Sequence, residues 1–311
     1  MRDNNFIFSM VLTISVLAVC VGIGYLLYAK YLSLTLSLLA ASFSIFLLLY
    51  LTIERFLQSE QKELEDLQKE EIENLKKIEI YRREFLAEVS HELRTPIFAV
   101  QGFIHTLMDG AIDDEKVREK FLHKAMKNTD RLSTLVNDLM IITQIEAGEL
   151  EMRIRRFNIH ELLLEVVESL EYKMTDKGRN ITCHIKPNGN RSVQVLADRE
   201  RIQQVLTNLI DNAIKYGNPT GNITVSLQKI EAQKLHIFVK DDGQGISEEH
   251  LDKIFRRFYR VDKSRSRERG GTGLGLAICK HFIEAHNEAI QVESICGEGT
   301  TFSFPLKLAE D

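Results

Sequence analysis

The chain has 311 residues, of which 44% are hydrophobic and 27% are charged, which leaves room for two folded domains and a membrane segment. Its formal net charge of −5 at pH 7 gives no electrostatic reason to expect a nucleic-acid-binding protein. The 4 cysteines form no C-x-x-C pair, so we expect free thiols in a reducing compartment and neither a zinc site nor a disulfide framework.

The first part of the chain is strongly apolar, because Lys30 is its only charged residue between Asp3 and Glu54. Residues 6–28 and 31–53 are each long enough to cross a bilayer, which takes about 20 residues of helix. We therefore predict a two-helix membrane anchor with a very short outer loop. The basic residues that follow favour a cytoplasmic location for the remainder. A cleaved signal peptide, or a lipoprotein-type box at residues 17–20, is the alternative for the first span.

Residues 54–80 are rich in Glu, Lys, Gln and Leu and contain no Gly or Pro, a composition that favours a continuous helix. Glu71 interrupts an otherwise apolar seam in this segment. A parallel two-stranded coiled coil is the predicted form, and a single solvated helix is the alternative. The residues near heptad spacing are Leu57, Leu64, Leu67, Leu75 and Ile78.

Residues 85–96 combine a buried stripe with a candidate reactive histidine. His91 lies off the stripe and is expected to be exposed, with Thr95 one helical turn later on the same face. Pro96 lacks a backbone donor and is expected to bend the helix after the site. The run is not the zinc motif H-E-x-x-H, because its fifth residue is Thr95. The apolar stripe at helical spacing is Phe85, Leu86, Val89 and Leu93.

A second amphipathic helix is predicted between residues 114 and 149, where apolar residues repeat at steps of three and four. With the first helix it would form an αα-hairpin. A hairpin with one apolar face needs a partner, and two copies give a four-helix bundle, so we expect a homodimer. The repeating residues are Phe121, Leu122, Ala125, Leu132, Leu135, Val136, Leu139 and Ile142.

After residue 150 the pattern changes to shorter, mixed elements. Helices are expected at 158–177, 199–216 and 274–286. Strands are expected at 180–186, 192–197, 222–230, 234–241, 289–295 and 300–308. This alternation predicts an α/β sandwich in which helices cover one mixed sheet.

Four motifs that could bind a ligand lie on this scaffold, at residues 208–216, 241–246, 270–276 and 297–302. Asn208 and Asn212 are one helical turn apart, and amide oxygens of this kind can ligate Mg²⁺. Asp241 ends a strand, where a carboxylate can accept a hydrogen bond from an exocyclic amine. The glycine-rich run 270–276 leads into a helix, and backbone amides there favour an anion. Neither common phosphate-binding fingerprint fits.

The run at 85–96 closely resembles the phosphoacceptor box of sensor histidine kinases. The four later motifs resemble, in order and spacing, the ATP-binding domain of histidine kinases, gyrase-type ATPases and heat-shock chaperones. The resemblance implies a membrane-bound sensor histidine kinase of bacterial two-component systems. ATP would phosphorylate His91, and an aspartate of a response regulator would then accept the phosphoryl group. Glu92 would hydrogen-bond the second ring nitrogen, and Thr95 would position a water that dephosphorylates the regulator.

The resemblance also implies the nucleotide site. Asn212 would ligate Mg²⁺ with Asn208 beside it, Asp241 would bind the adenine amine, and Thr300 would close the adenine side. Residues 254–262 resemble the family's phenylalanine box. Further site residues would be Lys215 and Tyr216 facing the phosphates and base, Gly243 and Gly245 shaping the pocket, Gly271, Gly273, Leu274 and Gly275 around the phosphates, and Arg257 and Arg260 as phosphate or domain contacts.

The expected organisation is two transmembrane helices at 1–53, a coiled-coil helix at 54–80, a dimerisation and phosphotransfer hairpin at 81–150 and an ATP-binding domain at 151–311. The catalytic part would lie in the cytoplasm, below a multi-pass anchor in the cytoplasmic membrane. Two departures from the family stand outside the expected chemistry: Arg256 replaces a common acid, and residues 286–288 replace a His-Gly-Gly turn. The alternatives are a clamp-type ATPase and a phosphatase or scaffold with a defunct nucleotide site. The stimulus, and phosphorylation within or across subunits, stay open.

Overall fold

The structure is a computed structural model that describes residues 2–28, 32–176, 179–186, 192–231, 233–262 and 271–309. It divides into two compact units, Met1–Arg83 and Glu84–Asp311, which are described separately. Helix α2 contributes residues to both.

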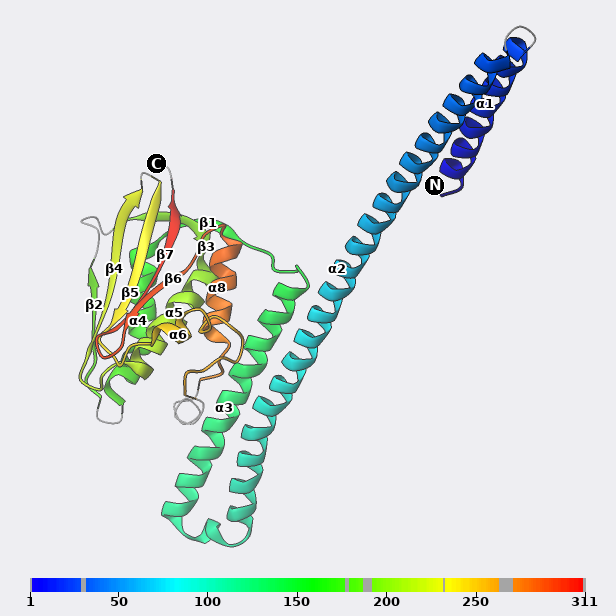
Figure 1. The fold of residues 1–311 in the computed structure, drawn as a ribbon. Helices are drawn as coiled ribbons and strands as arrows, with labels where there is room; N and C mark the ends of the chain where they lie inside the picture. Colours follow the sequence, from blue (N-terminus) through cyan, green and yellow to red (C-terminus); the bar gives the residue numbers. More distant parts are fainter. Residues whose placement is uncertain are drawn as a thin grey trace. The chain divides into compact units, whose positions relative to one another are not determined.

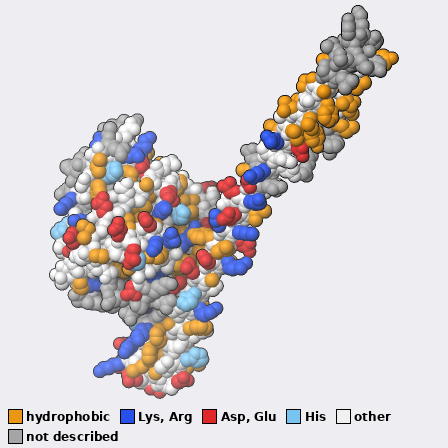
Figure 2. Space-filling view, viewed as in Figure 1, with side chains coloured by type: hydrophobic (Ala, Val, Ile, Leu, Met, Phe, Trp, Pro, Cys, Tyr) orange, Lys and Arg blue, Asp and Glu red, His pale blue; other side chains and the backbone are white. Residues whose placement is uncertain are grey.

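The first unit consists of α1 (Arg2–Tyr28) and the larger part of α2 (Leu32–Met108). Hydrophobic side chains gather on the outer surface of these helices, and mixed charges follow further along α2 (Figure 2). Both helices are long and apolar enough to cross a bilayer by length and composition, with windows of mean hydropathy 2.1 in α1 and 1.6 in α2. The predicted second span, the helix at 54–80 and the first hairpin helix form one continuous helix in the structure, α2. Pro96 lies inside this helix and does not end it.

The second unit opens with a helical hairpin, as predicted. The end of α2 is joined to α3 (Glu115–Glu146) by a turn that includes the short 3₁₀ helix η1 (Ala111–Asp113). Asp114 caps α3, since its carboxylate accepts hydrogen bonds from the amides of Lys116 and Val117. Past Glu146 the chain turns at Gly148, which has a φ of 68°, and the hairpin gives way to the α/β domain.

The α/β domain is built on one mixed seven-stranded sheet (Figure 1). The strands are β1 (Ile154–Asn158), β2 (Thr182–Lys186), β3 (Gln194–Asp198), β4 (Asn222–Glu231), β5 (Lys234–Asp241), β6 (Gln291–Ile295) and β7 (Gly299–Leu308). Their order is β1-β3-β7-β5-β4-β2, and β6 pairs with β7. Among the strand pairings of the described residues, β2 with β4 is parallel and the others are antiparallel.

Helices α4 (Ile159–Thr175), α5 (Arg199–Tyr216) and α8 (Gly275–Ala285) cover one face of this sheet (Figure 1). A short helix, α6 (Glu248–Leu251), follows β5 in the chain. The strands alternate, so that β5 turns Leu235, Ile237 and Val239 toward the helices, each at most 1% exposed. Full burial of such a side chain contributes about 1.5–3 kcal/mol. This two-layer core fixes the helix α5 that carries most of the candidate site.

Candidate active site

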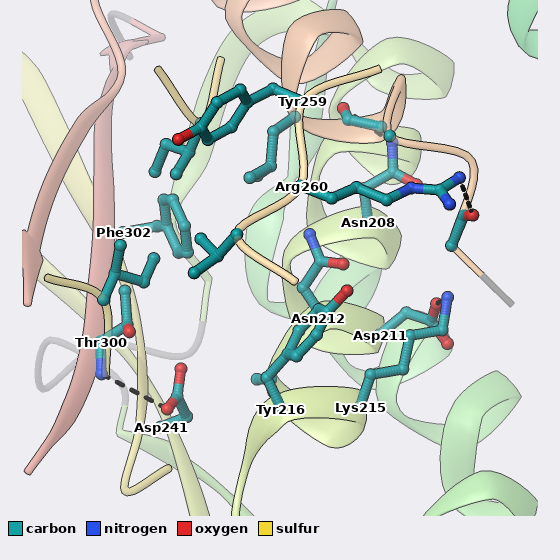
Figure 3. Close-up of a pocket in the computed structure, with 18 of the residues that line it drawn as sticks. Asn208, Asp211, Asn212, Lys215, Tyr216, Asp241, Tyr259, Arg260, Thr300 and Phe302 are labelled. Atoms are coloured by element: carbon teal, nitrogen blue, oxygen red, sulfur yellow. Dashed lines mark hydrogen bonds and ion pairs between the residues drawn. The ribbon is translucent and has the colours of Figure 1, made fainter. Parts of the chain in front are cut away.

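Helix α5 presents four polar side chains on the face that its apolar stripe leaves free. Asn208, Asn212, Lys215 and Tyr216 follow one another at steps of four, three and one (Figure 3). The opposite face, which includes Leu209, is fully buried in the core. Asp198 starts the helix by accepting hydrogen bonds from two amides of its first turn, so the polar residues are held at fixed positions along a rigid element.

Asp241 lies at the end of β5 with only 7% of its surface exposed. Its Oδ1 accepts hydrogen bonds from the amides of Gly243 at 2.9 Å and Thr300 at 3.3 Å. Burial raises the pKa of the Asp241 carboxyl above its ordinary value, against the lowering effect of those two amides. A Cβ at position 243 would lie 2.5 Å from the carbonyl oxygen of Tyr216, so only glycine allows this turn to approach α5 so closely.

The glycine-rich segment runs from Gly271 into the start of α8. Gly273 has a φ of 77° and packs against the backbone of Phe258. Leu274 is fully buried, and its amide donates to the hydroxyl of Thr272 at 3.2 Å. The segment is therefore anchored by a core leucine while its glycines stay at the surface of the site.

A cavity of about 500 Å³ lies between α5, the end of β5 and the glycine-rich segment. It has the size usual for a small-molecule site. Ten of the residues expected for the nucleotide line it: Asn208, Asn212, Lys215, Tyr216, Asp241, Gly245, Gly271, Gly273, Gly275 and Thr300. The wall also contains apolar residues, among them Ile254 and Phe302, and Phe302 lies on the side of Thr300 and Asp241 (Figure 3).

Three of the expected nucleotide residues do not line the cavity. Gly243 shapes the turn below Asp241, and Leu274 is a core residue. Arg257 instead pairs with Glu146 at the end of α3 and lies over the ring of Phe85, 5.5 Å from its centroid. Of the two arginines in the 254–262 segment, it is Arg260 that reaches the cavity wall.

The phosphoacceptor segment lies in α2, and His91 has 60% of its side chain exposed, as predicted. The expected hydrogen bond from His91 to Glu92 is not made, because its Nδ1 lies 4.0 Å from the nearest carboxylate oxygen. Glu92 instead pairs with Arg131 of α3 at 3.0 Å and with Arg260 at 3.1 Å. The hydroxyl of Thr95 donates to the backbone carbonyl of His91 at 3.2 Å.

Sequence reasoning missed Asp211, which lines the cavity beside Lys215 (Figure 3). Its carboxylate bridges Lys215 at 2.6 Å and Lys173 of α4 at 2.7 Å. Burial alone would raise the pKa of Asp211, but the two ammonium groups outweigh it and hold the pKa below its ordinary value. Asp211 therefore orients Lys215, and its spacing of four residues before that lysine was the signal in the sequence.

Asp138 was also missed, although it is the polar residue in the buried stripe of α3. It is 8% exposed and accepts a hydrogen bond of 2.8 Å from the hydroxyl of Thr272 in the glycine-rich segment. Burial raises the pKa of the Asp138 carboxyl, against the lowering effects of Thr272 and Lys215. A hairpin carboxylate thus forms part of the cavity wall.

Replacing Asp138 with asparagine should stabilise the protein at neutral pH, by about 0.5–2 kcal/mol. The amide oxygen can still accept from Thr272, while the desolvated charge is removed. A raised folded-state pKa means that the wild-type carboxyl is tolerated best at low pH and costs stability as pH rises through that pKa. The gain should therefore shrink toward pH 4 in urea titrations of the detergent-solubilised chain. The exposed Asp130 of the same helix gives the control, Asp130→Asn; equal gains from both variants would refute this account.

Two family models match the chain. The model "His Kinase A (phospho-acceptor) domain" matches residues 81–148, and "Histidine kinase-, DNA gyrase B-, and HSP90-like ATPase" matches residues 197–310. Sensor histidine kinase WalK of Bacillus subtilis (strain 168) is 37% identical over 239 residues, which cover 76% of this chain and 38% of WalK. The chain thus spans well under half the length of this relative.

Two solved structures share the arrangement of hairpin and α/β domain. Histidine kinase ThkA in complex with response regulator protein TrrA has a TM-score of 0.57 and 30% identity, covering 73% of this chain and 61% of that one. Full-length ShkA in complex with AMPPNP has a TM-score of 0.53 and 28% identity, covering 73% and 46% respectively. The adjacent matches to a phosphoacceptor domain and an ATPase domain, with an exposed histidine in the first and a cavity in the second, place this chain in the family of sensor histidine kinases of two-component systems.

Proposed function

We propose that this chain is a protein-histidine kinase that transfers the terminal phosphoryl group of ATP to His91. The observation that carries the proposal is the polarity of the cavity. One end offers the carboxylate of Asp241 among apolar walls, and the other offers Lys215, Arg260 and the glycine-rich segment. A flat apolar base with an exocyclic amine fits the first end, and a polyphosphate fits the second.

The residues of the phosphate end fit Mg²⁺ as the accompanying ion. The amide nitrogen of Asn208 donates to the carbonyl of Gly275 at 3.4 Å, which turns its oxygen away from that carbonyl. Asn212 lies one turn further on the same face. Amide oxygens together with phosphates and water suit Mg²⁺, and no group of three or more His, Cys, Asp or Glu that could hold a metal occurs among the described residues. Bound there by Asn212 and Asn208, the ion would neutralise phosphate charge.

In the proposed reaction a ring nitrogen of neutral His91 attacks the terminal phosphorus, the nitrogen–phosphorus bond forms, and the bond to the oxygen of ADP breaks. The exposure of His91 leaves its ring accessible. The carboxylate of Glu92, 4.0 Å from Nδ1, is near enough to stabilise the imidazolium after a small side-chain movement. Lys215, held by Asp211, supplies positive charge that stabilises the departing phosphates.

The second half of the proposed function is transfer from His91 to an aspartate of a response regulator, with Thr95 assisting dephosphorylation of that partner. The complex of ThkA with TrrA supports a partner of this kind, and the AMPPNP complex of ShkA supports ATP as the donor. We further propose a homodimer, anchored by α1 and the first part of α2 crossing the cytoplasmic membrane twice. The apolar windows of both helices support that anchor.

A clamp-type ATPase is the competing function, and the match of residues 81–148 to a phosphoacceptor domain counts against it, because a clamp needs no such segment. A defunct nucleotide site is disfavoured by the cavity, in which Asp241, Asn212 and the glycine-rich segment are brought together.

The test is phosphorylation of the full-length chain in detergent micelles with terminally labelled ATP and Mg²⁺. We expect label that is stable to base and labile to acid, as a phosphoramidate is, and none in His91→Gln. The exposed His123 of the same hairpin provides the control, since His123→Gln should label like the wild type. Label that persists in His91→Gln would overturn the site, and an unlabelled wild type would overturn the kinase activity.

A further inference from the structure

Glu92 connects the phosphoacceptor segment to the nucleotide cavity. Its Oε2 pairs with Arg131 at 3.0 Å and with Arg260 at 3.1 Å, and the three side chains are only 6–13% exposed. Arg260 is part of the cavity wall and also donates to the carbonyl of Gly271 in the glycine-rich segment. His91 is the residue next to Glu92. In one and the same chain, therefore, a residue of the cavity wall contacts the residue that follows the histidine.

Further contacts fix the α/β domain against the hairpin over several turns of helix. Thr272 of the glycine-rich segment donates to buried Asp138 at 2.8 Å. The rings of Phe85 and Phe258 lie with centroids 6.0 Å apart. Leu135 and Ile142 of α3 belong to the same buried core as the α/β domain, at 2% and 0% exposure. These contacts combine buried apolar side chains with hydrogen-bonded polar groups. The α/β domain therefore meets the hairpin in a packed interface and not through a single ionic contact.

This interface with the α/β domain leaves the opposite face of the hairpin exposed. On α3 the seated face includes Leu135, Asp138 and Ile142, whose spacing places them on one side of the helix. A different, exposed apolar row on α3 is Leu122, Met126, Val136 and Met140, at steps of four, ten and four. On α2 the exposed row is Leu86, Ile97 and Ile104. At about 100° per residue, the members of each row lie within about 80° of one another around the helix, and that side can take a second copy of the hairpin.

We propose that the nucleotide held by each chain phosphorylates His91 of that same chain. This inference rests on the proposed kinase function and decides between transfer within and across subunits. The cavity wall already contacts the neighbour of His91 in its own chain through Arg260. The face through which the dimer would form lies elsewhere on the hairpin. Each α/β domain can therefore stay against the hairpin of its own chain when the dimer forms. No residue of a second copy is then needed between the phosphate end of the cavity and the histidine.

The experiment uses mixed dimers of the full-length chain, made by co-producing two differently tagged variants and purifying through both tags in succession. In the first dimer one chain carries His91→Gln and the other Asn212→Ala. One chain then keeps only the nucleotide site and the other keeps only the histidine. With labelled ATP and Mg²⁺ we expect less than a few per cent of the wild-type label. Strong label on the Asn212→Ala chain would show transfer across the dimer and overturn the proposal.

In a second mixed dimer, label is expected for transfer within a chain and none is expected for transfer across the dimer. It pairs a wild-type chain with a chain that carries both His91→Gln and Asn212→Ala. Transfer within a chain predicts about half of the wild-type label, all of it on the wild-type chain. Transfer across the dimer predicts none, so absence of label here would also overturn the proposal. Failure of the kinase function itself is separate, because it would leave the wild-type homodimer unlabelled in the same assay.

Discussion

Replacing Asp241 with asparagine should weaken ATP binding about ten- to a hundredfold, corresponding to the loss of one hydrogen bond to a charged group, about 1.5–3 kcal/mol. The reason is the fixed orientation of the carboxylate. Its Oδ1 already accepts from the amides of Gly243 and Thr300. In asparagine the carbonyl oxygen must take that place, because an amide group there would face two donors. The NH₂ group is then turned toward the cavity, where it meets the adenine amine as donor against donor.

The same reversal predicts a change of base preference. Inosine triphosphate carries a carbonyl oxygen in place of the adenine amine. Wild type should therefore reject it, while Asp241→Asn should bind it better than ATP. Affinities measured by displacement of a fluorescent nucleotide from the full-length chain would show the exchange. Asp242→Asn is the matched control, since that carboxylate accepts from the amide of Asn222 and does not line the cavity. If both variants keep the wild-type preference for ATP, Asp241 does not read the base.

The raised pKa of Asp241 adds a pH dependence with a defined sign. Protonation turns the cavity-facing oxygen from an acceptor into a hydroxyl donor. Affinity for ATP should therefore fall as pH drops through the pKa of Asp241, which burial sets above the ordinary value for an aspartate. The asparagine variant has no such group and should lose this part of the pH dependence.

Much of the fold follows from local patterns in the sequence. Helix α5 begins and ends where predicted, at Arg199 and Tyr216, because Asp198 is a strong N-cap and Gly217 follows the last apolar turn. Strand β1 was not predicted. Arg155 and Arg156 interrupt its alternation, and its pairing with β3 depends on residues about 40 positions away. Local propensity carries no information about a partner so distant in the chain.

The candidate site likewise contains some residues that local sequence patterns predict and others that they do not. The polar face of α5 could be predicted, because Asn208, Asn212 and Lys215 share one side of a helix by spacing alone. The role of Asp138 could not, since its partner Thr272 lies 134 residues later and meets it only through the seat of the α/β domain on the hairpin. The resemblance to histidine kinases implied that Glu92 would hydrogen-bond the second ring nitrogen of His91. In the structure its carboxylate pairs with Arg131 and Arg260, and charge-assisted hydrogen bonds of this kind are stronger than neutral ones.

Gly299→Ala should destabilise the α/β domain by about 2–5 kcal/mol, the sum of a left-handed residue at about 1–2 kcal/mol and overpacking at about 1–3 kcal/mol. Gly299 starts β7 with a φ of 118°. A Cβ there would overlap the backbone carbonyl of Asp241 and lie 3.0 Å from the Cα of Asp242. Because both neighbours are backbone atoms, at the last residue of β5 and the residue after it, no side-chain rotation relieves the clash.

Gly297 supplies a control within the same turn. Its φ of 85° is also left-handed, but a Cβ at that position has no atom within 4 Å. Gly297→Ala should therefore cost only the backbone term, about 1–2 kcal/mol. Pulse proteolysis of the full-length chain in increasing urea would compare the two variants under one protocol. The clash also displaces the carbonyl end of Asp241, so Gly299→Ala should lose ATP binding even where it stays folded, while Gly297→Ala keeps it. Equal destabilisation by the two substitutions would mean that the turn can move away from β5, and the close approach would then not be what holds Asp241 in place.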